Sequence, residues 1–256
     1  MIDRHRAYVS ATQLQQARTA DAFVLPPDVC HRFVRVLRLP HQAAVALFDG
    51  TGLAVYGKLN IRAKPVCLTN IQLQQHVQSA PHLHIAQALC RPTKLQEVVR
   101  NCTPLAVQRF IWFHSSRCTH SPKEVRSHHL QHLQRIAQDA VRQSEQWHMP
   151  HIEQPISFAD LLTSCSTFDG LCVVGDPHSD IWIVQHLLQP TQLPSSALVI
   201  IGPEGGLSDT EKEALQQQGA VCVNWASFVL RTELAACVAL TAVHNAMRLR
   251  SLQANC

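Results

Sequence analysis

The feature that most restricts the fold is a series of short apolar runs that alternate with helical segments from about residue 82 onward. The runs are residues 84–89, 110–113, 171–174, 197–201 and 220–223. Continuous apolar runs of this length are typical of parallel strands buried on both faces, and parallel strands need crossover helices between them. We therefore predict an α/β fold with a mostly parallel sheet, and helices that include residues 94–102, 128–147 and 232–248.

The first part of the chain has short apolar runs separated by turn residues. Runs 44–48 and 53–56 flank Asp49-Gly50, which predicts a β-hairpin. Residues 66–73 alternate between apolar and polar side chains, as in a half-buried strand. A short helix is expected over residues 27–37. Together these elements predict a small β-barrel-like domain with one helix.

The composition changes near residues 74–81, so we predict two domains, residues 1–73 and residues 74–256. The first carries nine Lys and Arg against four Asp and Glu, and the second carries thirteen against fourteen. The net charge of +4 therefore comes from the small domain, which suits contacts with phosphate groups. The candidate contacts are Arg4, Arg6, Arg32, Arg35 and Arg38. The alternative is that these arginines form an ordinary solvated surface.

Three of the nine glycines lie in one window, Ile201-Gly-Pro-Glu-Gly-Gly-Leu-Ser208, between an apolar strand and a helix over residues 209–218. Ser208 and Glu211 form a capping box that begins this helix. The window is neither a P-loop nor Gly-x-Gly-x-x-Gly, and Glu204 would repel a phosphate. A ligand with an adenosine end and a cationic or neutral centre fits better. The alternative is a tight turn without a ligand.

A second motif, Val229-Leu-Arg-Thr-Glu-Leu-Ala235, follows one strand later. Thr232 is expected to cap the last helix, and Glu233 suits its first turn. Arg231 precedes the helix, where it could contact a base or a phosphate. The alternative for Arg231 is a structural ion pair.

The cysteines and histidines do not indicate a disulfide framework or a metal site. The ten cysteines contain no Cys-x-x-Cys, and several lie in apolar runs. His128, His129 and His132 share a predicted helix, but two ligands at helical spacing do not make a site, so we predict no metal. No membrane-spanning or export segment is apparent. We expect a reduced, cytoplasmic protein without a membrane partner.

These motifs resemble the RsmE family of 16S ribosomal RNA uridine N3-methyltransferases, which belongs to the SPOUT superfamily. The resemblance rests on the glycine window, on Leu230-Arg-Thr-Glu233, and on small-domain segments such as Leu47-Phe-Asp-Gly50. It implies a C-terminal α/β-knot domain with a deep trefoil knot, preceded by a PUA-like RNA-binding β-barrel domain. It also implies a homodimer that uses S-adenosylmethionine and acts on 16S rRNA or the small ribosomal subunit.

The resemblance assigns roles to residues in both motifs. Arg231 and Glu233 become the candidate catalytic residues; we expect Arg231 to stabilise a uridine anion and Glu233 to anchor Arg231 or a partner loop. The candidate cofactor-binding residues are Gly175, Asp176, Ile201, Gly202, Pro203, Glu204, Gly205, Gly206, Trp225, Ala226, Leu230 and Thr232.

Several polar family positions are replaced in this chain, although the glycine window is intact. The departures are Asn101, Pro104, Gln146, Phe228 and Leu234. They leave open an alternative function, a non-catalytic or retargeted RNA-binding paralogue that keeps the fold and the cofactor pocket.

Overall fold

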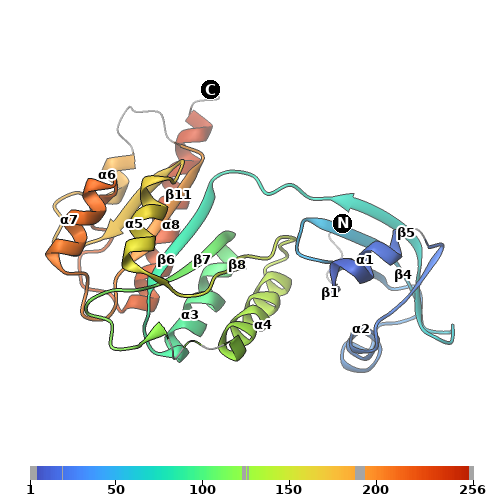
Figure 1. Cartoon of the computed structure of the whole chain (residues 1–256). Coiled ribbons are helices and arrows are strands. Elements are labelled where there is room, and N and C mark those ends of the chain that lie inside the picture. Colours follow the sequence, from blue (N-terminus) through green and yellow to red (C-terminus); the bar gives the residue numbers. More distant parts are fainter. Residues whose placement is uncertain (1–4, 19, 123–124, 126, 188–193, 254–256) are drawn as a thin grey trace. The chain divides into compact units, whose positions relative to one another are not determined.

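The computed structural model describes residues 5–18, 20–122, 125, 127–187 and 194–253, with side chains described up to residue 250 (Figure 1). The chain divides into two compact units. The first comprises Met1–Gln78 and Val141–Met149, and the second comprises Ser79–Ala140 and Pro150–Cys256. Residues 141–149, which the sequence analysis assigned to the second domain, therefore pack with the first unit.

The first unit contains a five-stranded, mostly antiparallel sheet in the order β1-β3-β4-β5-β2. Its strands are β1 (Arg6–Tyr8), β2 (Ala22–Val24), β3 (Ala44–Phe48), β4 (Leu53–Asn60) and β5 (Cys67–Gln75). The antiparallel pairing of β3 with β4 confirms the predicted hairpin. Only β1 and β3 run parallel among the strand pairs of the described residues of this sheet.

Within residues 5–18 and 20–78, the first unit has two helical regions instead of the single one predicted. Helix α2 (Pro27–Cys30) continues as a π-helix (His31–Val36), in the expected place. Helix α1 (Ala11–Ala17) was missed because it is short and rich in glutamine, with only Leu14 and Ala17 buried. Its signal was the capping box formed by Ser10 and Gln13.

The second unit is built on a seven-stranded sheet. All strand pairs among its described residues are parallel, which confirms the predicted sheet type. The order is β12-β10-β11-β6-β7-β8, and β9 also pairs with β7. The strands are β6 (His82–Ala88), β7 (Val107–His114), β8 (His151–Ile152), β9 (Ile156–Ser157), β10 (Leu171–Gly175), β11 (Ser196–Ile201) and β12 (Val221–Val223).

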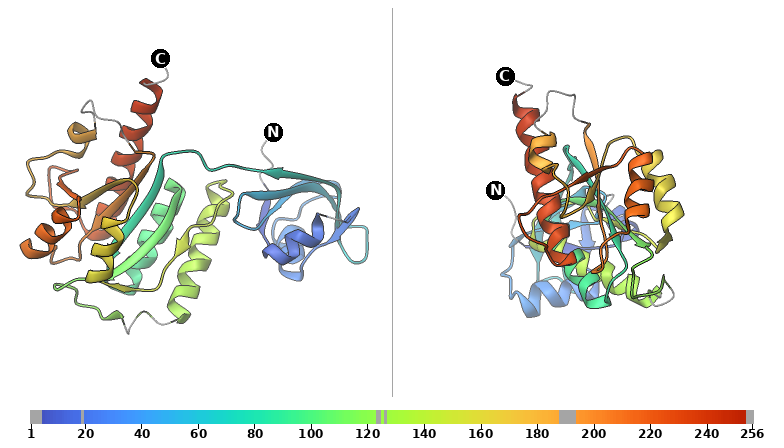
Figure 2. Two further views of the ribbon diagram at one scale, coloured as in Figure 1. Left: turned by 45° about the horizontal axis from the view of Figure 1, so that its top comes forward. Right: turned by 90° about the vertical axis from the view of Figure 1, so that its left-hand side faces the viewer.

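Helices cover both faces of this sheet (Figure 2). Helix α8 packs against α3, α6, β6 and β11, whereas α5 and α7 pack together on the other face, against β7 and β12. The helices are α3 (Pro92–Cys102), α4 (Ser127–Gln143), α5 (Phe158–Ser166), α6 (Ile183–Leu187), α7 (Asp209–Gln217) and α8 (Thr232–Gln253), with a 3-10 turn at Thr103–Leu105. None of the helices in the described ranges is long and apolar enough to cross a membrane.

Helix α4 ends at Gln143, four residues before the predicted end. Glu145 has a φ of 59°, which stops the helix, and Trp147 then stacks on His76 with ring centroids 4.3 Å apart. The apolar periodicity of α4 could not reveal this end, because the aromatic partner of Trp147 lies in a distant part of the chain.

Candidate active site

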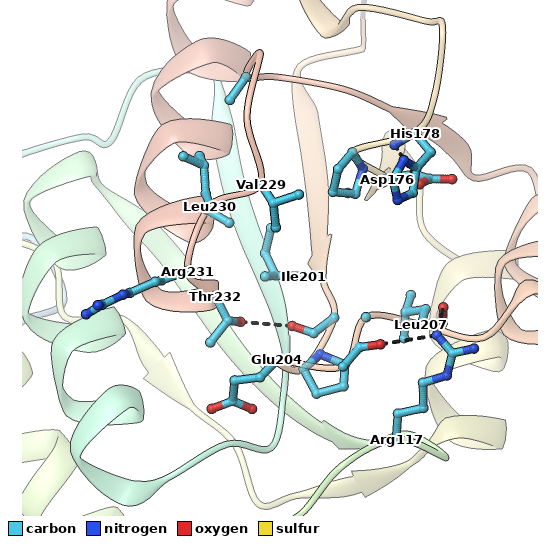
Figure 3. Close-up of a pocket in the computed structure, with 18 of the residues that line it drawn as sticks. Arg117, Asp176, His178, Ile201, Glu204, Leu207, Val229, Leu230, Arg231 and Thr232 are labelled. Atoms are coloured by element: carbon cyan, nitrogen blue, oxygen red, sulfur yellow. Dashed lines mark hydrogen bonds between the residues drawn. The ribbon is translucent and has the colours of Figure 1, made fainter.

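A pocket of about 880 Å³ lies at the carboxyl ends of β10, β11 and β12. Its walls come mainly from three turns, residues 175–178, 201–207 and 223–235 (Figure 3). Ligands of α/β proteins usually bind at this edge of the sheet. The volume is within the range typical of small-molecule sites, roughly 300–1,000 Å³.

The glycine loop between β11 and α7 forms one wall of the pocket. Its bend requires glycine at position 206, where φ is +68°, and the Gly206 N–H donates to the Pro203 carbonyl at 2.9 Å. The Ser208 hydroxyl accepts from the Glu211 N–H, and the Glu211 carboxylate accepts from the Ser208 N–H. The predicted capping box is confirmed, and it fixes where the loop ends and α7 begins.

The segment that follows β7 is hydrogen-bonded to the glycine loop. Arg117 Nη1 donates to the carbonyls of Gly205 at 3.1 Å and Leu207 at 3.3 Å (Figure 3). The neighbouring Ser116 N–H donates to the buried Glu211 carboxylate at 2.7 Å. Arg117 could not be predicted from the sequence, because no local pattern links it to a loop 88 residues later.

A buried polar chain joins the glycine loop to the last helix. Gln87 at the end of β6 donates through Nε2 to the Thr232 hydroxyl at 2.8 Å, and this hydroxyl donates to the Gly202 carbonyl at 2.9 Å (Figure 3). Gln87 is fully buried and Thr232 is 6% exposed. Buried polar groups need such partners, so these hydrogen bonds fix the start of α8 against the glycine loop. The signal for Gln87 was a polar residue within the apolar segment 85–89.

The turn after β10 packs tightly against the turn after β12. A Cβ at Gly175 would lie 2.4 Å from Trp225 Cζ2, so the ring of Trp225 occupies the space that a side chain would need. Asp176 follows, and its carboxylate pairs with Lys212 Nζ of α7 at 3.1 Å. This contact links a second wall of the pocket to α7.

Glu233, in the first turn of α8, pairs with Lys94 of α3 at 2.5 Å. Burial opposes ionisation of this carboxyl, but the hydrogen bond from Lys94 and the charges of Lys94 and Arg231 together hold the pKa of Glu233 below its ordinary value. We expected Glu233 to anchor Arg231 or a partner loop; in the structure its carboxylate contacts Lys94. Arg231 is exposed, and its side chain extends away from Asp176 and His178 (Figure 3).

A family model described as an RNA methyltransferase domain matches residues 78–244, which is more than half of the chain. The chain belongs to this family. The match covers every strand of the parallel sheet and all three pocket turns, and it confirms the family that the sequence motifs indicate.

Individual relatives agree with this RNA methyltransferase assignment. Ribosomal RNA small subunit methyltransferase E of Bacillus subtilis is 26% identical over 245 residues, covering 93% of this chain and 95% of the relative. The protein of that name from Neisseria gonorrhoeae, solved with S-adenosyl methionine, superposes with a TM-score of 0.76 at 20% identity, covering 94% and 97% of the chains. A Legionella pneumophila methyltransferase, solved with the same cofactor, gives 0.75 at 22% identity, covering 94% and 97%.

In this RNA methyltransferase the pocket brings together all of the predicted cofactor-binding and catalytic residues. Gly175, Asp176, Ile201, Gly202, Pro203, Glu204, Gly205, Gly206, Trp225, Ala226, Leu230, Arg231, Thr232 and Glu233 all line it. The lining residues that were not predicted from the sequence include Arg91, Lys94, Arg117 and His178. The glycine motif predicted the turns that surround the pocket. It did not predict the contributions of helix α3 and of the segment after β7, which contact those turns.

The structure separates the predicted RNA-binding arginines. Arg35 and Arg38 are exposed, Arg32 is half-buried, and Arg4 lies outside the described residues. Arg6 is only 2% exposed; its guanidinium carbon lies 3.7 Å from the ring centroid of Trp147 and 4.9 Å from that of Phe48. Burial lowers the pKa of Arg6, against smaller opposing effects of Tyr56 and Glu145. Arg6 is therefore a packing residue, and its prediction as a phosphate contact was wrong.

The histidines form no metal centre within the part of the chain that is described. No group of three or more His, Cys, Asp or Glu side chains there is arranged to hold a metal ion. The adjacent His128 and His129 contact each other through their rings, whose centroids are 3.9 Å apart.

Proposed function

We propose that this chain transfers a methyl group from S-adenosylmethionine to N3 of a uridine in small-subunit 16S ribosomal RNA. The observation that carries the proposal is the convergence of the intact glycine loop, the Gly175 turn and the start of α8 on one pocket, in a chain similar over 93% of its length to a small-subunit rRNA methyltransferase. We also propose that it acts in the cytoplasm and as a homodimer.

The pocket residues fit the cofactor. When bound, S-adenosylmethionine supplies an electrophilic methyl group on a cationic sulfonium. Glu204 is an exposed carboxylate in the pocket wall, which suits a cationic ligand and disfavours a phosphate. The backbone of Gly202–Gly206 lies open to a ligand because glycines leave room for close approach. Leu230 and Ile201 supply apolar surface for an adenine ring.

Two residues at the start of α8 carry the proposed chemistry. The N3–H of uridine is a weak nucleophile until its proton is lost, so a cation beside the base lowers the free energy of the anion. Arg231 is exposed at the pocket and supplies that charge. Glu233 is ion-paired with Lys94 and stays ionised, which makes it a positioning residue. We assign no general base.

The similarity to small-subunit rRNA methyltransferases also supports a proposal about the fold of each unit. We infer that the second unit is a SPOUT domain with a C-terminal trefoil knot, and that residues 1–73 form a PUA-like domain that binds RNA. The exposed Arg35 and Arg38, with Arg32, are the proposed contacts to the RNA backbone.

The test is transfer of a tritiated methyl group to small ribosomal subunits by the wild type, by Arg231→Ala and by Arg100→Ala. Arg100 is a matched control because it is exposed on α3 and does not line the pocket. We expect Arg231→Ala to reduce transfer by about 100-fold, as when an oxyanion-type donor is lost. The Arg100 variant should transfer normally. Equal transfer by both variants, with cofactor binding intact in both, would remove Arg231 from the mechanism.

The alternative is an RNA-binding paralogue without activity, or one directed to another RNA site. It is motivated by the departures at Pro104, Gln146, Phe228 and Leu234, of which Phe228 and Leu234 are 83% and 49% exposed. Cofactor binding without a methylated product on any RNA would support an inactive paralogue. A different methylated nucleoside would support retargeting.

A further inference from the structure

Phe228 and Val229 form an exposed apolar ledge on the segment that leads from β12 into α8. Phe228 is 83% exposed and Val229 is 74% exposed, and both line the pocket described above. Single exposed apolar residues are normal on protein surfaces. Two adjacent ones at the mouth of a functional pocket indicate a surface that a ligand covers.

The charges around the ledge favour an anionic ligand. Among the described residues, the ion pairs at the pocket join Lys212 to Asp176 and Asp209, and Lys94 to Glu233 and Glu97. Arg91 and Arg231 line the same pocket, are exposed, and take part in none of these ion pairs. Glu204 is the opposing exposed carboxylate, and it lies on the glycine loop.

We propose that Phe228 is a stacking platform for an unpaired base of the RNA substrate, with Arg91 contacting a phosphate beside that base. A nucleotide combines a flat apolar face with a negative charge, which is the combination that this surface presents. Proteins that recognise single-stranded RNA hold splayed bases on aromatic rings and hold the backbone with arginines. This inference rests on the proposed RNA substrate and deepens it, because it names the residues that hold the RNA at the pocket.

A second copy of the chain is the other occupant that an exposed apolar ledge could have. In a two-fold symmetric contact centred on the ledge, the same surface would meet itself. Arg91 and Arg231 of one copy would then approach the same arginines of the other, which disfavours that contact. The charge distribution therefore favours RNA over self-association at this surface.

The experiment measures binding of a fluorescein-labelled, uridine-containing single-stranded RNA of the small-subunit sequence. The variants are Phe228→Ala, Phe228→Trp, Phe228→Leu, Arg91→Ala and the control Val77→Ala. Val77 is 86% exposed and does not line the pocket. Cofactor affinity is measured by calorimetry and molar mass by light scattering for each variant.

We expect Phe228→Ala and Phe228→Leu to weaken RNA binding about tenfold, because base–aromatic stacking is lost, whereas Phe228→Trp retains affinity. Arg91→Ala should weaken binding and lower its salt dependence by about one counterion. Molar mass should not change in any variant, and the Val77→Ala control should keep the wild-type affinity for both RNA and cofactor.

Two results overturn the inference while the proposed function stands. The first is an unchanged RNA affinity in Phe228→Ala, and the second is a halved molar mass that accompanies the loss of affinity. If the wild type binds no RNA and transfers no methyl group, the proposed function fails together with this inference.

Discussion

Lys94 Nζ on α3 lies 2.5 Å from Glu233 Oε1 in the first turn of α8. The two helices also pack against each other. A carboxylate at this position complements the positive end of the α8 dipole. The pair therefore holds the start of α8, and with it Arg231 and Thr232, in a fixed position relative to α3.

This pair predicts a pH-dependent contribution to stability. The pKa of Glu233 is lowered in the folded protein, so the contribution is complete above its ordinary pKa of about 4.3 and is lost as the pH falls through the lower folded value. The pKa of Lys94 is raised by its hydrogen bonds to Glu233 and Glu97, so the same contribution is lost at strongly alkaline pH. The difference in free energy of unfolding between wild type and Glu233→Gln, measured by urea titration, should vanish at low pH. A constant difference down to pH 2 would contradict the assignment.

Thr232→Val should destabilise the protein, because valine keeps the shape but removes the hydroxyl. The Gly202 carbonyl then loses its donor at 2.9 Å and keeps only the longer contact from Gln87 Nε2 at 3.5 Å, and the Gln87 amide loses the shortest of its hydrogen bonds. An unsatisfied buried group costs about 1–3 kcal/mol. Thr232→Ser, which keeps the hydroxyl, is the control and should retain most of the stability. If the two variants unfold at the same denaturant concentration, the hydroxyl has no role in fixing the loop.

Arg117→Ala should weaken cofactor binding by about tenfold, because two hydrogen bonds that hold the Gly205 and Leu207 carbonyls are lost. Arg117→Lys should recover part of the affinity, since lysine can donate but lacks the planar fork. Isothermal titration with S-adenosylmethionine measures the effect. Arg100→Ala, which should bind normally, is the matched control. Unchanged affinity in Arg117→Ala would show that the loop keeps its conformation without this contact.

Gly175→Ala should destabilise the second unit by about 1–3 kcal/mol, in the range for overpacked sites. The added Cβ would lie 2.4 Å from Trp225 Cζ2. The double variant Gly175→Ala/Trp225→Leu should lose less stability than the sum of the two single variants, because leucine vacates the space. Thermal unfolding of all four proteins tests this. Strict additivity would argue against direct steric contact.

Local patterns in the sequence were sufficient for the hairpin of β3 and β4, the parallel sheet and the capping box of α7, because each depends on residues close together in the chain. The contacts that shape the site are long-range. Gln87 and Thr232 are 145 residues apart, and Arg117 and Gly205 are 88 apart. No periodicity connects such residues.

The misassignment of Arg6 has the same origin. Its charge and position in a basic segment indicated a phosphate contact, but the ring that covers it belongs to Trp147, far along the chain. Strands β8 and β9 could not be predicted either. Each has two residues and exists only through pairing with β7.

The central claim is that the pocket directs methyl transfer to N3 of uridine in small-subunit RNA. The most direct test incubates unmethylated small ribosomal subunits with the protein and S-adenosylmethionine, then digests the RNA and identifies its nucleosides by mass spectrometry. We expect stoichiometric 3-methyluridine with the wild type and about 100-fold less with Arg231→Ala at equal time. Cofactor binding without any 3-methyluridine, or methylation of a different nucleoside, would contradict it.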